Sequence, residues 1–78
     1  MDIDSKLSHA FQIGLGLDAK TPFNTLEFAK NEHWDSIAHM KLIAAIEEEF
    51  AIRLEVNDIL GMSSYPIARD IVNKYLEI

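Results

Sequence analysis

Ser36 directly follows Asp35, and His39 comes three residues later. Serine, histidine and aspartate are the residue types of a hydrolytic triad, in which the histidine takes the proton of the serine hydroxyl. Ser36 and His39 can be neighbours on one helix, but Asp35 is poorly placed to orient the imidazole. No nucleophile elbow or recognisable oxyanion element accompanies them. We therefore expect no catalytic residue, and we interpret Ser36 as a point of attachment.

The pattern after Ser36 places this serine at the start of an amphipathic helix. Backbone N–H groups are unpaired in the first turn of a helix, and the helix dipole adds partial positive charge there. A phosphate ester on Ser36 would therefore be stabilised. A serine that only caps the helix explains the same pattern, since serine is a preferred N-cap residue. Helix-end chemistry alone leaves both interpretations open.

This helix is predicted over 36–50, with one apolar face. Its inward stripe contains His39, Leu42, Ile43, Ile46 and Phe50. The opposite face carries Ile37, Lys41, Ala44 and Glu48, with Met40 and Glu47 beside it. We expect His39 to be a half-buried packing residue, because it lies on the inward stripe.

Three consecutive glutamates, Glu47, Glu48 and Glu49, end the helix. Negative charge opposes the dipole there by about 0.3–1 kcal/mol per exposed group, so we expect them not to serve stability. A solvated face is the simpler interpretation, and a docking edge for a basic partner is the alternative. Ile37 and Met40, with Glu47 and Glu48, outline a small apolar patch rimmed by acid, which suits a transient protein interface.

The remaining elements are also helical. A first helix over 3–13 buries Ile3, Leu7, Ala10, Phe11 and Gly14, with Asp2 as N-cap and Gly14 and Gly16 as terminators. A single turn is expected over 57–61, and a last helix from Ser63 or Ser64, with Pro66 in its first turn. Its buried face should contain Ile67, Ala68, Ile71, Val72, Tyr75 and Leu76, and its wet face Arg69, Asp70, Asn73 and Lys74.

The connection over 15–35 carries many large apolar side chains: Leu17, Phe23, Leu26, Phe28 and Trp34. We expect it to be pinned across the bundle by these side chains, with Trp34 as the anchor. No strand pattern is evident. The chain is therefore predicted to be all-α, a small four-helix bundle with three longer helices, one short third helix and a single domain over 1–78.

Composition limits the possible functions. The net charge is −6, and the seven basic residues are scattered, which argues against binding of nucleic acid. No apolar run is long enough to span a bilayer, and the acidic N-terminus does not resemble a targeting signal. The chain has no cysteine, and its three histidines lack metal-ligand spacing, so we expect no structural metal. We expect a cytoplasmic monomer.

Residues 34–40, Trp-Asp-Ser-Ile-Ala-His-Met, followed by the segment from Leu42 to Phe50, closely resemble the central helix of acyl carrier proteins. The resemblance extends through Asn57-Asp58-Ile59 and Ser63-Ser64 and covers residues 34–76. The first helix and the long connection agree in length and pattern, but less specifically.

This resemblance implies a function for Ser36. It implies that Ser36 carries a 4′-phosphopantetheine arm, added from coenzyme A by a separate phosphopantetheinyl transferase, and that the thiol of the arm holds acyl groups as thioesters. Asp35 matches the aspartate that helps to position magnesium during this transfer. The resemblance also assigns partner recognition to Asp35, Ile37, Met40, Glu47 and Glu48, towards acyl-loading, condensing and acyl-transfer enzymes.

Two residues depart from the carriers of primary fatty-acid synthesis. Lys41 lies where those carriers usually show an acidic residue, and His39 replaces a smaller one. The sequence looks more like stand-alone carriers of specialised polyketide, unusual-lipid or polysaccharide-acylation pathways. Two alternatives stay open, an aminoacyl or peptidyl carrier and an unmodified helical adaptor.

Overall fold

The structure, a computed structural model, describes residues 3–17, 20, 22, 25–30 and 32–76. This part of the chain forms four helices, α1 (Ile3–Leu15), α2 (Ser36–Phe50), α3 (Val56–Gly61) and α4 (Tyr65–Leu76). Within it the only extended pairing is an isolated antiparallel bridge between Glu27 and Ser64. The predicted all-helical class is confirmed. The expected cap Asp2 and the loop residue Phe23 lie outside the described residues.

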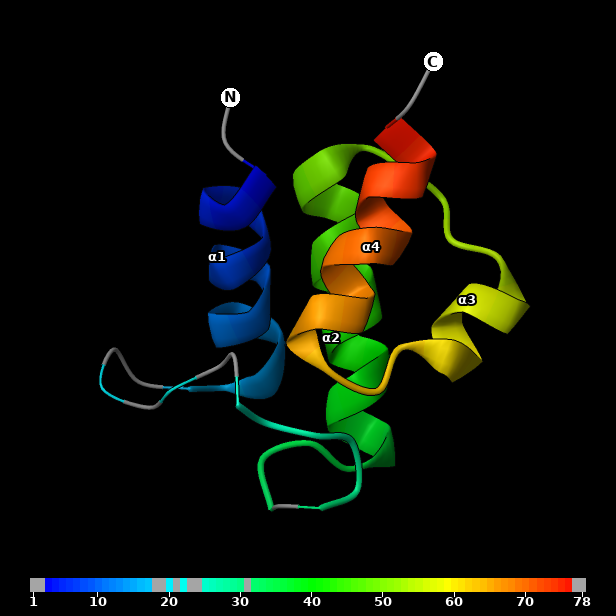
Figure 1. The fold of residues 1–78 in the computed structure, drawn as a ribbon. Helices are drawn as coiled ribbons and strands as arrows, with labels where there is room; N and C mark the ends of the chain where they lie inside the picture. The colour runs from blue at the N-terminus through cyan, green and yellow to red at the C-terminus, as the bar shows by residue number, and fades with distance from the viewer. Residues whose placement is uncertain (1–2, 18–19, 21, 23–24, 31, 77–78) are drawn as a thin grey trace.

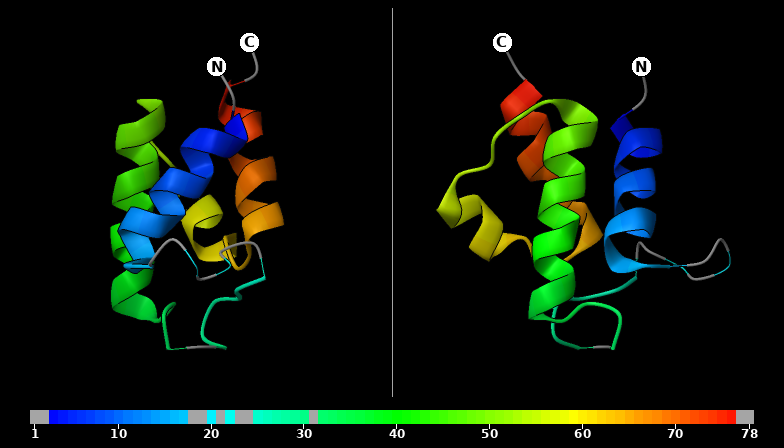
Figure 2. Two further views of the ribbon diagram at one scale, coloured as in Figure 1. Left: turned by 90° about the vertical axis from the view of Figure 1, so that its left-hand side faces the viewer. Right: turned by 180° about the vertical axis from the view of Figure 1, so that it is seen from behind.

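Three helices form the body of the molecule, and α3 lies beside them (Figure 1). α1 packs against both α2 and α4. The start of α1 and the end of α4 lie at one end of the bundle, whereas the start of α2 lies at the other (Figure 2). The largest fully buried side chains belong to Leu7, Phe11, Trp34, Leu42, Ile46, Met62 and Val72. The core therefore draws on α1, α2, α4 and the connections between the helices.

Gly14 does not end α1 as we expected, because the helix continues through Leu15. Gly14 is buried, and a Cβ at this position would lie 2.5 Å from the Cα of Leu42 in α2. Glycine is therefore needed for close approach of the two helices. Gly16, at φ +65, follows the end of α1 and fits the predicted role of terminator.

The long connection is pinned as predicted. Trp34 is fully buried, with its ring edge-on to Phe11 at 5.3 Å between centroids. Phe28 also packs edge-on to Trp34, at 6.3 Å. The backbone N–H of Phe28 donates to the carbonyl of Ser63 at 2.9 Å, next to the Glu27–Ser64 bridge. The connection is thereby held to the segment that precedes α4, and Trp34 fixes the point at which α2 begins.

The buried face of α4 is narrower than its pattern predicted. Ala68 and Val72 are buried and Ile71 and Tyr75 are half-buried, as expected, but Ile67 is 40% exposed and Leu76 38%. The prediction for these two residues is wrong, because at 100° per residue they lie on opposite edges of the face that contains Ala68 and Val72. The four polar residues of the predicted wet face are all exposed.

α3 is held mainly by polar contacts, since none of its residues is fully buried. The carboxylate of Asp58 accepts hydrogen bonds from Lys74 Nζ at 2.8 Å and from the Tyr75 hydroxyl at 2.5 Å. The Tyr75 hydroxyl in turn accepts from the backbone N–H of Glu55 at 2.8 Å. These bonds attach the short helix to α4.

Candidate functional site

Asp35, and not Ser36, is the N-cap of α2. Asp35 has extended backbone angles, and its Oδ1 accepts a hydrogen bond from the N–H of Ala38 at 2.8 Å. Ser36, which the sequence offered as a candidate cap, therefore does not cap the helix. Aspartate and serine are both favoured caps, and here the aspartate side chain reaches the third N–H of the helix. Ser36 becomes the first residue of α2.

The Ser36 side chain is exposed and has no hydrogen-bond partner among the residues that the structure describes. Its hydroxyl therefore faces solvent at the positive end of a fifteen-residue helix. Because α2 begins directly after the buried Trp34, this end of the helix is fixed to the core.

His39 is buried, at 8% exposure, and both of its ring nitrogens are engaged. Nδ1 accepts a hydrogen bond from the indole N–H of Trp34 at 2.9 Å. Nε2 lies 2.7 Å from the carbonyl oxygen of Ile59 in α3, to which it donates. An indole nitrogen can only donate and a carbonyl can only accept, so the two partners select the Nε2-protonated tautomer.

The apparent triad is therefore not a catalytic arrangement. The lone pair of His39 Nδ1 accepts from Trp34, and its N–H donates to Ile59, so neither nitrogen is available to Ser36. Asp35 directs one carboxylate oxygen at the N–H of Ala38 and not at the imidazole. Asp35 and His39 therefore stabilise the fold.

Ile37 and Met40, two of the predicted recognition residues, are exposed at 70% and 59%. Lys41, Ala44 and Glu48 are exposed too, which confirms the outer face predicted for α2. Large apolar side chains in contact with solvent beside Ser36 form an accessible surface at the start of α2.

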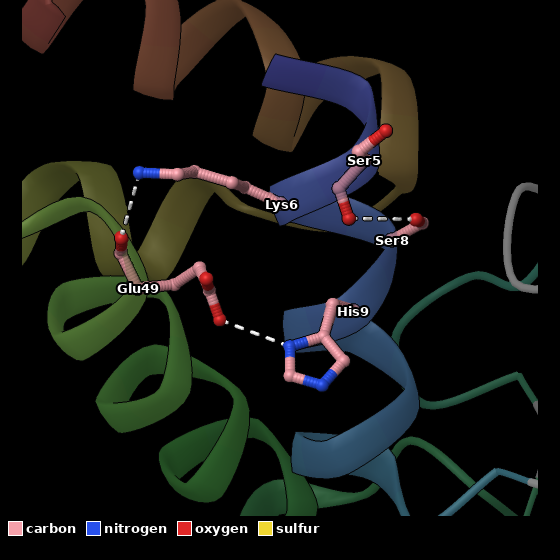
Figure 3. A network of polar contacts seen from close by, with 5 residues as sticks. All are labelled: Ser5, Lys6, Ser8, His9 and Glu49. Carbon is pink, nitrogen blue, oxygen red and sulfur yellow. Dashed lines mark hydrogen bonds and ion pairs between the residues drawn. The ribbon is translucent and has the colours of Figure 1, made fainter. Parts of the chain in front are cut away.

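Glu47 and Glu49 make contacts within the chain, contrary to our expectation that the three glutamates do not serve stability. Glu47 Oε2 accepts from the backbone N–H of Leu54 at 2.9 Å, beyond the end of α2. Glu49 Oε1 accepts from His9 Nδ1 at 3.0 Å, and its carbonyl oxygen accepts from Lys6 Nζ at 3.4 Å (Figure 3). Both α1 residues point towards the end of α2 (Figure 3). Of the three, Glu48 is exposed, whereas Glu47 and Glu49 are half-buried.

Two ion pairs shift the pKa of the acids that fasten α4. Hydrogen bonds from Arg69, 2.7 Å from Asp4 Oδ1, and from Tyr65 lower the pKa of Asp4. The bonds that Asp58 accepts from Lys74 and Tyr75 lower its pKa in the same way. These bonds also raise the pKa of both donor side chains. α4 is thus linked electrostatically to α1 and to α3.

The sequence analysis did not identify three apolar residues that the structure shows to be exposed. Ile13 is 61% exposed on α1, and Val56 and Leu60 are 69% and 78% exposed on α3. The exposure of Ile13 could have been predicted, because this residue lies well away from the predicted inward face of its helix. The exposure of Val56 and Leu60 could not, because a six-residue helix is too short to show a period.

The described residues contain no group of three acidic or histidine side chains that could hold a metal ion. No helix in that same part of the chain is long and apolar enough to cross a membrane. No family profile, curated protein or solved structure matches this chain. The function must therefore be inferred from the geometry around Ser36.

Proposed function

We propose that this chain is an acyl carrier protein, which holds acyl groups as thioesters on a 4′-phosphopantetheine arm attached to Ser36. The observation that carries the proposal is the exposed hydroxyl of Ser36 at the first position of α2. The nearby side chains of Asp35 and His39 are hydrogen-bonded to other residues. A serine without an available base is a poor nucleophile. A substrate of another enzyme needs only that its hydroxyl be accessible and fixed in place.

The residues around Ser36 fit a covalently attached phosphodiester. The first turn of α2 provides unpaired N–H groups and the positive end of the helix dipole, which stabilise negative charge. The carboxylate of Asp35 acts in the opposite direction, although its Oδ1 is already bonded to the N–H of Ala38. Asp35 is also exposed, so it remains accessible to a magnesium ion held by the transferase. The arm supplies a thiol, which this cysteine-free chain lacks.

The outer face of α2 supplies a surface on which enzymes that act at Ser36 can dock. Ile37 and Met40 provide exposed apolar area, and Glu48 provides an exposed negative charge further along the helix. A few buried residues at the centre of such a surface usually carry most of the binding energy, and methionine is enriched there. Glu47 is half-buried, and its carboxylate accepts a hydrogen bond from the backbone N–H of Leu54. A docking partner would therefore have to share this carboxylate with Leu54.

The proposal is tested by incubating the protein with coenzyme A, magnesium and a broad-specificity phosphopantetheinyl transferase, and then measuring the intact mass. We expect the mass to rise by one phosphopantetheine. The Ser36→Ala variant should fold and keep its original mass. If the wild-type protein is unchanged under conditions that modify a known carrier, the proposal is wrong.

Two results would point to the other functions considered above. Loading with aminoacyl but not acyl donors would indicate an aminoacyl or peptidyl carrier. Partner binding that is lost in Ile37 or Glu48 variants, but retained in Ser36→Ala, would indicate an unmodified adaptor.

A further inference from the structure

A hollow of about 330 Å³ lies beside Ser36, between the end of α1 and the first turns of α2. We call it the Ile13 hollow. Its described lining includes residues from α1, from the connection and from α2, namely Ile13, Gly16, Glu32, Asp35, Ile37 and Lys41. Ser36 is not part of the lining, although both of its chain neighbours are.

We propose that the Ile13 hollow receives an apolar side chain of the transferase that modifies Ser36, and that Lys41 favours a carboxylate placed beside that side chain. This inference rests on the function proposed above. It assigns to the hollow a protein ligand of defined chemistry, a large apolar residue flanked by an acidic one.

The apolar part of the argument comes from two helices. Ile13 of α1 and Ile37 of α2 line the same hollow, and their side chains are 61% and 70% exposed. A partner side chain inserted between them would remove both from water, which is how central residues of an interface contribute affinity. The hollow is small for a ligand site, since its volume is at the lower end of the range for small-molecule pockets.

The hollow is preformed, because α1 and α2, which form two of its walls, are fixed against each other. Gly14 also lines the hollow, and it allows the backbone of α1 to approach Leu42 of α2 closely. A Cβ at position 14 would lie 2.5 Å from the Cα of Leu42. The buried ring of Trp34 fixes the beginning of α2. Binding to a preformed hollow costs little conformational entropy.

The charges of the lining define where an acidic group can sit. Lys41 is exposed and, among the described residues, has no ion-pair or hydrogen-bond partner. Glu32 and Asp35 line the hollow nearer the start of α2 and repel a carboxylate. Lys41 lies six residues beyond Asp35, about 9 Å along the helix axis. A carboxylate is therefore favoured only at the Lys41 end, which gives the contact an orientation.

The position of Ser36 around α2 favours a partner protein, rather than the group attached to Ser36, as the occupant of the Ile13 hollow. At 100° per residue, Ser36 lies about 140° around α2 from Lys41, whereas Ile37 and Lys41 are one turn apart on the same side. A group attached to Ser36 thus starts on another face of the helix. An enzyme that inserts a side chain into the Ile13 hollow can reach Ser36 without covering it.

The chemistry of the hollow can be tested on the unmodified protein. We would titrate 3-phenylpropionate and 3-phenylpropylamine as probes, and follow the amide signals of Gly16, Ile37 and Lys41 by NMR. We expect saturable shifts with the carboxylate and not with the amine, and their loss in Lys41→Gln and Ile13→Ser. Equal shifts with both probes, or none with either, would overturn the charge preference.

The use of the hollow is tested by steady-state kinetics of modification with coenzyme A and the transferase. Ile13→Ser should raise KM for the carrier about tenfold with kcat unchanged, because only docking is affected. Leu60→Ser is the matched control, because Leu60 is an exposed apolar residue outside the hollow, and this variant should leave KM unchanged. Lys41→Glu should raise KM, whereas Lys20→Glu, with the same change in net charge, should not.

An unchanged KM in Ile13→Ser, or a lower KM in Lys41→Glu, would overturn this inference while the carrier function stands. If the wild-type protein is not modified at all, the carrier function fails, and the probe titration still reports on the hollow. Shifts of the same amides only after Ser36 has been modified and acylated would show that the carried group, and not the transferase, occupies the hollow.

Discussion

At the scale of single residues, the protein separates a serine from the two side chains that could activate it. Asp35 caps α2 through Ala38, and His39 bonds to Trp34 and Ile59. The residue types and their spacing were evident in the sequence, as was the inward position of His39. The partners of His39 were not, because Ile59 is twenty residues away in the chain.

His39→Ala should lower the free energy of unfolding by about 2–4 kcal/mol. It leaves the buried indole N–H of Trp34 and the carbonyl of Ile59 without partners, and it removes packed atoms beside them. Urea denaturation followed by Trp34 fluorescence would measure this. Glu48→Ala, at an exposed position, should change stability by less than about 0.5 kcal/mol.

The same variant separates a structural role of His39 from a catalytic one. Under conditions in which His39→Ala is still folded, modification of Ser36 by the transferase should proceed. Any thioester hydrolysis by the purified wild-type protein that disappears in His39→Ala would instead show that the histidine acts as a base.

At the scale of the elements, the sequence predicted α2 with its observed bounds and inward stripe, because its apolar period is clear over fifteen residues. It offered Ser36 as a candidate cap of α2, whereas Asp35 is the cap, and it misassigned the role of Gly14. Two preferred cap residues stand side by side at the start of α2, and pattern alone cannot choose between them. The reason for Gly14 lies in Leu42, a contact between helices that local sequence does not show.

Gly14→Ala should destabilise the protein by about 1–3 kcal/mol, because the new methyl group would force α1 away from the backbone of α2. Gly61→Ala is the control, since nothing lies within 4 Å of a Cβ there and alanine favours the helix. We expect it to be neutral or to stabilise by up to about 1 kcal/mol. Equal urea midpoints for the two variants would contradict the close approach of the helices.

Ala51, which ends α2, has left-handed backbone angles of φ 55 and ψ 45. Ala51→Gly should therefore raise the free energy of unfolding by about 0.5–1 kcal/mol, since glycine adopts this conformation without the steric cost. The same substitution at Ala44, in the exposed middle of α2, should lower it by about 1 kcal/mol. Thermal denaturation of Ala51→Gly and Ala44→Gly tests whether their effects on stability have opposite signs. A loss of stability in both variants would show that Ala51 is not strained.

At the scale of the whole molecule, the helices are joined by a packed core and by polar contacts between their ends. The core residues of α1 and α2 were largely predictable from periodicity. The contacts of Glu49, Asp4 and Asp58 were not, because each joins two different helices. The contact of Glu47 was not either, because it depends on how the chain turns back after the end of α2. The width of the buried face of α4 also depends on the whole assembly, since periodicity does not reveal how many neighbours a helix has.

These ion pairs predict how stability depends on pH. The pKa values of Asp4 and Asp58 are lowered from 3.8 in the folded state, so their contribution is present above pH 3.8 and is lost as the pH falls through the folded-state values. The pKa values of Lys74 and Tyr75 are raised from 10.5 and 10.0, so their contribution is lost as the pH rises through the raised values.

Asp58→Asn should therefore flatten the dependence of the urea midpoint on pH at both the acid and the alkaline ends. Measurements between about pH 2 and 11 would show it, with Asp70→Asn as an exposed control on α4. A wild-type midpoint that does not change below pH 3.8 would contradict these ion pairs.

The whole molecule can then be understood as a support that fixes the start of one helix and exposes Ser36 on it. Tandem mass spectrometry after incubation with coenzyme A, magnesium and the transferase tests this most directly. We predict a single phosphopantetheine on the peptide that contains Ser36, and none on folded Ser36→Ala. An unmodified wild-type protein beside a modified reference carrier, or a group attached to any other residue, would contradict it.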